Sequence, residues 1–113
     1  MSLFYEFDQN NSGGNFKIND ERGIGPRVWI EAVDYAHAIA RAESIGIYFD
    51  GVEMGIDCGC CGDRWYPPLE EDAMPAVEID PRYDFNWHDT IYVHRLGGTI
   101  ERTTKAKAEA PDA

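Results

Sequence analysis

The sequence has no apolar run that approaches the roughly 20 residues a membrane-spanning helix needs. Its first residues, MSLFYEFDQN, lack both the basic region and the apolar core of a cleavable secretion signal. Cysteine is also scarce, and an odd number of cysteines confined to positions 58 to 61 cannot cross-link a secreted fold. These absences predict a cytoplasmic protein with no membrane partner.

Positive charge is in short supply as well. The chain has 10 Lys and Arg against 21 Asp and Glu, which gives a net charge of −11. A surface this acidic repels nucleic acid, so no nucleic-acid partner is expected. The acidic residues are dispersed, and their one run of three is Glu70-Glu71-Asp72. This dispersion favours a role in solubility over imitation of nucleic-acid charge.

Catalytic signatures are missing too. The loop that contains Gly13-Gly14 has no Lys-Ser/Thr pair for a phosphate-binding loop, and Gly23-Ile24-Gly25 is too short for a dinucleotide fingerprint. No serine or cysteine stands in a nucleophile elbow, and no spacing singles out two carboxylates. An enzyme is therefore not the first expectation.

The apolar periodicity predicts the secondary structure. Alternation at 3–8 and 27–32 predicts two strands. Between residues 34 and 45 the period becomes that of a helix, with Asp34 at the N-cap position and Gly46 just past the end. The helix carries one apolar stripe, formed by Tyr35, Ala38, Ile39, Ala42 and Ile45.

Two further strand pairs are expected after the helix. Residues 47–49 predict a strand that turns back at Asp50-Gly51 into residues 52–54, with the alternative that it exits directly into the cysteine loop. Residues 90–104 predict a C-terminal hairpin around a two-residue turn at Gly97-Gly98. The pairs predicted by this turn are Val93 with Arg102 and His94 with Glu101.

Together these elements predict an α+β fold, a mostly antiparallel sheet of four to six strands with one helix packed on it. The chain length fits one domain, at 1–104, followed by a frayed polar tail at 105–113. One helix covers only part of such a sheet. The other face is therefore expected to meet another copy of the chain in a homo-oligomer.

The cysteines predict a candidate metal site. Cys58-Gly59-Cys60-Cys61-Gly62 contains the C-x-x-C-G form of a zinc knuckle, in which two thiolates converge on the metal and glycine permits the tight turn. One knuckle is half of a tetrahedral site, so reduced and unligated cysteines remain open beside zinc. The candidate ligands are Cys58, Cys61, Cys60 and His88, with His94 or the knuckle of a second subunit as further sources.

Aromatic and arginine side chains predict a candidate binding site for a small nucleotide-like ligand. Aromatic rings offer surfaces on which a base stacks, and guanidinium groups offer paired donors to phosphate. The alternative is that the tryptophans are core residues and the arginines balance surface carboxylates. The candidate ligand-binding residues are Tyr5, Asn11, Arg27, Trp29, Arg64, Trp65, Trp87 and Arg95.

Three segments, at 4–16, 28–52 and 57–65, resemble a set of small uncharacterised accessory proteins encoded in the genomes of tailed bacteriophages. The resemblance brings no catalytic residue. It implies a phage origin and hence the host cytoplasm as the location. Short acidic phage proteins of this kind often inhibit host defence, some of them as oligomeric sponges that bind nucleotide immune signals without cleaving them.

The first expected function is therefore a non-enzymatic anti-defence protein that sequesters a nucleotide-like immune signal in pockets at subunit interfaces. The alternative is an acidic zinc-knuckle adaptor that binds and inhibits a host protein. A third hypothesis is an enzyme that degrades such a nucleotide, for which the sequence names no catalytic base.

Overall fold

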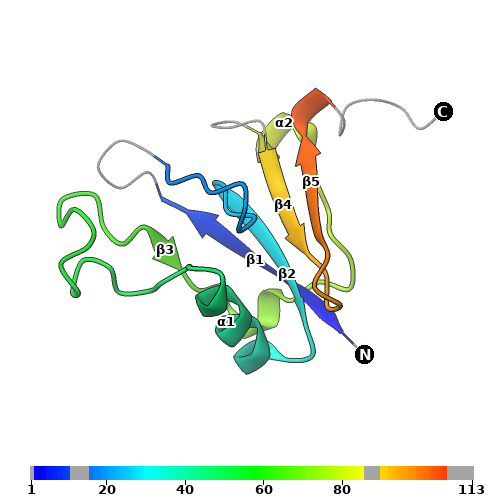
Figure 1. Cartoon of the computed structure of the whole chain (residues 1–113), viewed down its shortest axis with the longest axis horizontal. Coiled ribbons are helices and arrows are strands. Elements are labelled where there is room, and N and C mark those ends of the chain that lie inside the picture. Colours follow the sequence, from blue (N-terminus) through cyan, green and yellow to red (C-terminus); the bar gives the residue numbers. More distant parts are fainter. Residues whose placement is uncertain (1, 11–15, 86–89, 107–113) are drawn as a thin grey trace.

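The computed structural model describes residues 2–10, 16–85 and 90–106. They form one five-stranded sheet with a ten-residue helix against one face (Figure 1). In spatial order the strands are β3 (Trp65–Tyr66), β1 (Leu3–Gln9), β2 (Arg27–Ala32), β4 (Thr90–His94) and β5 (Ile100–Thr104). Neighbours are antiparallel except β2 and β4, which are parallel. The predicted α+β fold with a mostly antiparallel sheet is confirmed.

The helix side of the sheet holds the larger core. Strands β1 and β2 place Tyr5 opposite Ile30 and Phe7 opposite Val28, so these four side chains share one face. Trp65 at the edge strand β3 joins them and is 2% exposed. The buried residues of this cluster are Tyr5, Phe7, Ile24, Val28, Ile30, Ala32, Ala38, Ala42, Ile47 and Trp65.

Helix α1 (Tyr35–Ser44) begins and ends as the sequence predicts. The Asp34 carboxylate caps it by accepting a hydrogen bond from the amide of His37 at 2.8 Å. At the other end Gly46 has φ +106°, and the amides of Gly46 and Ile47 bond the carbonyls of Glu43 and Ala42. This is the left-handed glycine ending that a side chain at position 46 would strain.

The second face of the sheet is covered in part by the same chain. The connection from β3 to β4 contains a 3-10 turn, η2 (Glu70–Asp72), and a one-turn helix, α2 (Pro81–Asp84). Met74 exchanges backbone hydrogen bonds of 2.8 and 2.9 Å with Phe4. The cluster beneath the connection comprises Phe4, Trp29, Phe85, Ile91 and Val93, with Met74, Val77 and Ile79 packed on it. The homo-oligomer, inferred from an uncovered face, remains a prediction.

The C-terminal hairpin forms, but its predicted register is wrong by one residue. The strands pair Val93 with Glu101 and His94 with Ile100. The loop has three residues, because Gly98 takes φ +97° and its amide bonds the carbonyl of Arg95 at 2.9 Å. A type I turn followed by a left-handed glycine is the usual three-residue hairpin loop. The shift places Glu101 on the face of Val93 and Arg95.

The predicted strands after α1 are also wrong. Residues 47–49 pair with no strand in the described part of the chain, and residues 51–57 form successive turns and bends. Asp50 has φ 58°, which starts a compact loop in place of a hairpin, and the amides of Ile56 and Asp57 both bond the carbonyl of Gly51. The loop extends beyond β3 to the outer end of the molecule (Figure 1).

Among the described residues, no helix is both long and apolar enough to cross a bilayer. Residues 105–106 form a helical turn, and residues 107–113 of the predicted polar tail lie outside the described residues.

Candidate functional site

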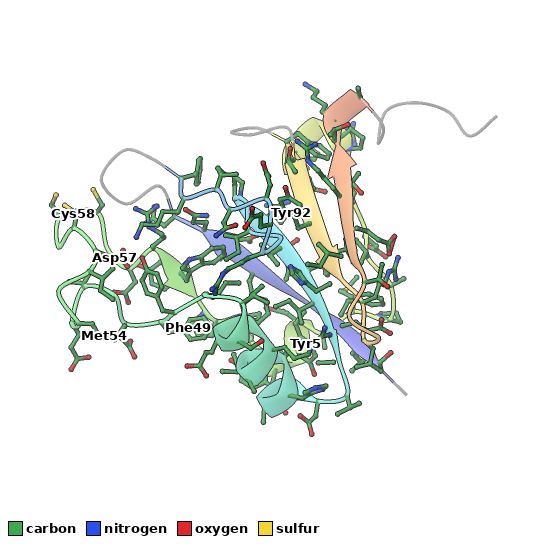
Figure 2. All side chains as sticks on the ribbon, viewed as in Figure 1. Tyr5, Phe49, Met54, Asp57, Cys58 and Tyr92 are labelled. Atoms are coloured by element: carbon green, nitrogen blue, oxygen red, sulfur yellow. The ribbon has the colours of Figure 1, made fainter. Side chains whose placement is uncertain are left out.

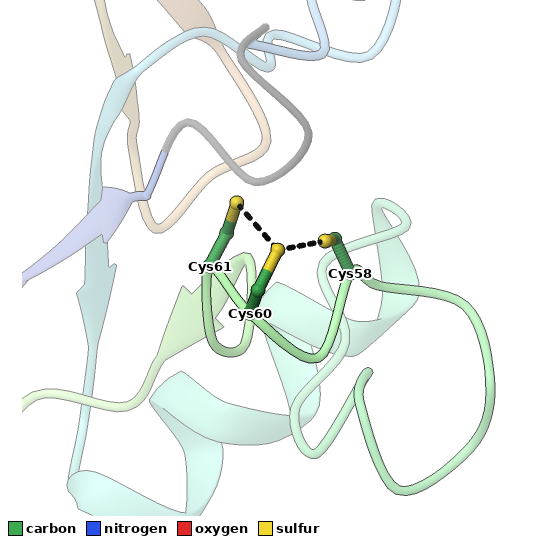
Figure 3. A group of neighbouring side chains, drawn as sticks. All are labelled: Cys58, Cys60 and Cys61. Carbon is green, nitrogen blue, oxygen red and sulfur yellow. Dashed lines mark hydrogen bonds between the residues drawn. The ribbon is translucent and has the colours of Figure 1, made fainter.

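The three cysteines gather at the surface of the loop between α1 and β3 (Figure 3). Cys60 Sγ lies 2.8 Å from Cys58 Sγ and 3.8 Å from Cys61 Sγ. All three sulfurs lie within 4.8 Å of one another, so together they could hold a metal ion. Figure 2 places Cys58 at the outer end of this loop and Asp57 on its inner side.

Hydrogen bonds from the sheet hold the cysteine loop in place. The Asn10 side chain donates to the carbonyls of Cys61 and Asp63 at 2.7 and 3.2 Å. The Asp63 carboxylate accepts from the amide of Val52 at 2.9 Å. Gly62 has φ +87°, and a side chain there would come within 2.6 Å of the Tyr66 hydroxyl. These contacts brace the backbone of the cysteine loop at several points.

Local hydrogen bonds also set the acidity of the thiols. The Cys60 thiol and amide, followed by the thiol and amide of Cys61, lower the pKa of Cys58 to about 7. The same thiol contacts raise the pKa of Cys60 to about 11. Amide donors to the first sulfur are what a zinc knuckle provides, and a thiolate is the form that binds metal. Cys58 is therefore the thiol of the cluster that ionises most readily near neutral pH.

Three thiols are suitable ligands for zinc, and they would supply three of the four ligands of a tetrahedral site. No fourth ligand joins the cysteines among the described residues. The predicted ligand His88 lies outside these residues. His94 lies in β4, 3% exposed, with Nε2 2.8 Å from the carbonyl oxygen of Gly23, and burial lowers its pKa.

Behind the cysteine loop lies a buried ion pair. Arg64 Nε lies 3.6 Å from Asp57 Oδ1, and the two side chains are 8% and 1% exposed. The Asp57 carboxylate also accepts from the Tyr48 hydroxyl at 2.9 Å and the Arg64 amide at 2.8 Å. Arg64 further donates to the Gln9 side chain at 2.9 Å. The structure therefore gives this predicted ligand residue a role in bracing the loop.

The other predicted ligand-binding residues do not form one site. Trp29 and Trp65 belong to the clusters on opposite faces of the sheet. Tyr5 is buried, with its ring edge-on to Tyr35 at 5.9 Å. Arg95 lies over the Phe4 ring and pairs with Glu101, and Arg27 pairs with Glu6, Asp8 and Asp84. The remaining two, Asn11 and Trp87, lie outside the described residues.

A pocket on the helix side brings together residues that the sequence analysis missed. It has a volume of about 560 Å³ and lies between the segment before β2 and the end of α1. Its lining residues are Lys17, Ile18, Asn19, Arg22, Ile24, Ile45, Gly46, Tyr48 and Trp65. Of the predicted set it contains only Trp65. The sequence signal for the others was weak, two basic residues in a chain segment dominated by turns.

Two basic side chains, Lys17 and Arg22, give this pocket positive charge. Lys17 Nζ lies 5.6 Å from the centre of the Tyr48 ring and 3.5 Å from its hydroxyl. Arg22 lies beside Gly46, and its backbone amide is fixed by the Asn19 side chain at 3.2 Å. Within the part of the chain that the structure describes, neither cation pairs with a carboxylate. The pocket can thus receive an anion.

These features define an acidic α+β protein with a surface thiol cluster and an open cationic pocket. The chain belongs to a family that is described as a domain of unknown function, DUF7296, whose model matches residues 2–110. No curated protein and no solved structure matches the chain.

Proposed function

We propose that this protein is a non-enzymatic binding protein that sequesters a small nucleotide-like ligand in the pocket between Lys17 and Tyr48. The observation that carries the proposal is that Lys17 and Arg22 line this pocket and that neither pairs with a carboxylate of the described residues, although the chain has a net charge of −11. Because the chain resembles accessory proteins of tailed bacteriophages, we infer that the ligand is a host immune signal and that the protein acts in the host cytoplasm.

The electrostatics of the pocket support an anionic ligand. Acidic residues outnumber basic ones by 21 to 10, and a basic side chain that is not paired with a carboxylate is available to an anionic ligand. Asp20, two residues before Arg22, is engaged elsewhere, because it accepts the hydroxyl of Tyr92, and among the described residues no ion pair joins Arg22 to the adjacent Glu21. A guanidinium left open at a pocket presents paired donors whose geometry matches phosphate oxygens.

The shape and the rings of the pocket support an aromatic group on that anion. A volume of about 560 Å³ falls within the ~300–1,000 Å³ range of small-molecule sites. Tyr48 is half-buried and borders the pocket beside the Lys17 ammonium, so a base can stack where a phosphate is neutralised. The pocket opens at the surface, where a second subunit in the proposed homo-oligomer would enclose the ligand.

Arg22→Ala is expected to weaken the binding of the preferred nucleotide about 10- to 100-fold, because a charge-assisted hydrogen bond contributes ~1.5–3 kcal/mol. Isothermal titration of nucleoside phosphates and cyclic dinucleotides measures it. Arg82→Ala, which removes an equal charge from a side chain that is 77% exposed on α2, is the control and should leave affinity unchanged. Chromatography of the recovered ligand should show it intact, whereas product would establish the degrading enzyme. If none of these nucleotides gives a heat of binding with the wild-type protein, the proposal is contradicted.

The cysteine cluster favours a second candidate, a zinc-stabilised acidic adaptor that binds a host protein. Zinc bound by Cys58, Cys60 and Cys61 would brace the loop at the outer end of the molecule. Its fourth ligand would come from solvent, His88 or a second subunit. This candidate needs neither pocket cation, so the two proposals separate experimentally.

Cys58→Ser is expected to abolish stoichiometric zinc binding, because it removes the thiol with the lowered pKa. Competition with a chromophoric zinc chelator and elemental analysis measure the metal content. Met54→Ser, exposed in the same loop, is the matched control and should retain zinc. A wild-type protein that takes up no zinc in this assay removes the adaptor's structural basis.

A further inference from the structure

The cysteine cluster can undergo a reaction that neither proposed function uses, the formation of a disulfide bond within the loop. Cys58 Sγ and Cys60 Sγ lie 2.8 Å apart, close to the ~2.05 Å length of a disulfide. All three cysteines of the cluster are exposed, so a small reagent in solvent can reach their sulfur atoms. Two neighbouring thiols and an open approach are what a reversible oxidation site requires.

The geometry of the chain selects the two cysteines that pair. Cys60 and Cys61 are adjacent in sequence, so their Cα atoms are ~3.8 Å apart, below the ~4.4–6.8 Å that disulfides usually span. The sulfur of Cys60 lies between those of Cys58 and Cys61 (Figure 3). Of its two sulfur contacts, the one with Cys58 is shorter, at 2.8 Å against 3.8 Å. The structure therefore favours Cys58 with Cys60 over the C-x-x-C pair of Cys58 with Cys61.

The backbone around the pair accommodates this bond. Gly59 separates the two cysteines, and a carbon added there would meet its first neighbour only at 3.8 Å, so the side of the turn at residue 59 is open. The amides of Cys61 and Gly62 both bond the carbonyl of Cys58 at 3.2 Å and hold the turn. A bond between the sulfur atoms of Cys58 and Cys60 replaces neither of these backbone contacts. The turn is thus expected to persist after oxidation.

We propose that Cys58 and Cys60 form a reversible dithiol–disulfide pair whose oxidant is a small-molecule disulfide. The Cys58 thiolate attacks one sulfur of the small disulfide, the S–S bond of the reagent breaks, and one small thiol leaves. The Cys60 thiolate then attacks Cys58 Sγ in the mixed disulfide and expels the second small thiol. In total the protein loses two electrons and two protons, and the small disulfide gains both and becomes two thiols.

This oxidation would change the candidate zinc site and leave the cationic pocket as it is. It consumes two of the three thiols that could hold a metal ion, and Cys61 alone does not make a zinc site. The cationic pocket has no cysteine among its lining residues. The adaptor candidate would thereby come under redox control. That consequence rests on the zinc proposal, whereas the disulfide pair itself does not.

Incubation of the reduced wild-type protein with oxidised glutathione tests the pair. Iodoacetamide then blocks the remaining thiols, and intact mass and peptide mapping locate the blocking group. We expect the loss of two of the three thiols, no retained glutathione, the blocking group on Cys61, and full recovery in dithiothreitol. A blocking group on Cys60 would indicate a Cys58–Cys61 bond. That result, a disulfide between two chains, or three blocked cysteines would each overturn the proposal.

Cys60→Ser and Cys61→Ser are matched variants, since each removes one exposed thiol from the same turn. Cys61→Ser keeps both partners and should form the internal disulfide as the wild type does. Cys60→Ser lacks the second attacking sulfur and should retain glutathione on Cys58 as a mixed disulfide. Circular dichroism checks that both variants are folded. Equal retention of glutathione in the two variants would contradict the assigned pair.

The zinc assay applied to the reduced and the oxidised wild-type protein tests the redox control separately. Zinc uptake by the reduced form and its loss in the oxidised form would support this control, and equal uptake by both would overturn it. A reduced protein that takes up no zinc counts against the zinc adaptor. The thiol count and the position of the blocking group alone decide on the disulfide pair, so the two failures are distinguishable.

Discussion

Replacement of Arg64 by alanine is expected to lower the free energy of unfolding by about 3–5 kcal/mol, the usual result of breaking a buried ion pair from one side. The partner carboxylate of Asp57 is 1% exposed and cannot recover hydration in place. It would keep only the Tyr48 hydroxyl and the amide of residue 64 as donors. Gln9 would lose its contact with the guanidinium as well.

Urea denaturation measures the loss, and Arg82→Ala provides the matched control. The Arg82 and Asp80 side chains are 77% and 42% exposed, so removing that surface pair should leave the free energy of unfolding nearly unchanged. Adding Asp57→Asn to Arg64→Ala should recover part of the loss, because the double variant buries no unpaired charge. Additive effects of the two substitutions would contradict the assigned coupling. Arg64→Ala is consequently a poor test of ligand binding, for which Arg22→Ala is suited.

Gly23→Ala is expected to destabilise the fold by about 2–5 kcal/mol. Gly23 has φ +69°, a left-handed conformation that costs an alanine ~1–2 kcal/mol. The added carbon would also lie 2.7 Å from both His94 Nε2 and Ile100 Cγ2, and overpacking of this kind costs about 1–3 kcal/mol. Ile100 can move because it is 41% exposed, but His94 is fixed by its hydrogen bond to the Gly23 carbonyl.

Thermal and urea unfolding of Gly23→Ala measure this effect, and Gly97→Ala is the control. Gly97 lies in the hairpin loop, where an added carbon meets nothing within 4 Å. Its substitution should therefore leave stability nearly unchanged. Equal stability of the two variants would mean that the segment before β2 packs more loosely on His94 than the structure shows.

The sequence was enough to predict the strands and the helix whose conformation depends on residues close together in the chain. Alternation of Val28, Ile30 and Ala32 with Arg27, Trp29 and Glu31 marked β2, and Asp34 and Gly46 marked both ends of α1. These signals depend on residues within one turn or one strand. The fold class followed because one amphipathic helix and several short strands allow few layered arrangements.

Long-range contacts decided what the sequence could not show. The turn after Asp50 looks like a hairpin turn, but Asp57 bonds Tyr48 and Arg64 and closes the segment into a loop. The hairpin register depended on the left-handed φ of Gly98, which two adjacent glycines leave ambiguous.

The candidate sites show the same limit. Adjacent cysteines in the sequence did meet, because four residues of loop cannot separate them far. The tryptophans and arginines came from different strands, and strand register placed Trp29 and Trp65 on opposite faces. Lys17, Arg22 and Tyr48 meet only through the packing of two irregular segments, for which no periodic signal exists.

The parallel pairing of β2 and β4 has a consequence for how the chain reaches this structure. β1 and β2 pair directly along the chain, as do β4 and β5, but the central pairing joins residue 27 to residue 91. Closure of so long a loop is slow, so the two antiparallel halves are expected to form first and the central seam last. Until then the edges of β2 and β4 present unpaired backbone to other chains, which makes the folding intermediate, and not the finished sheet, the species prone to aggregation.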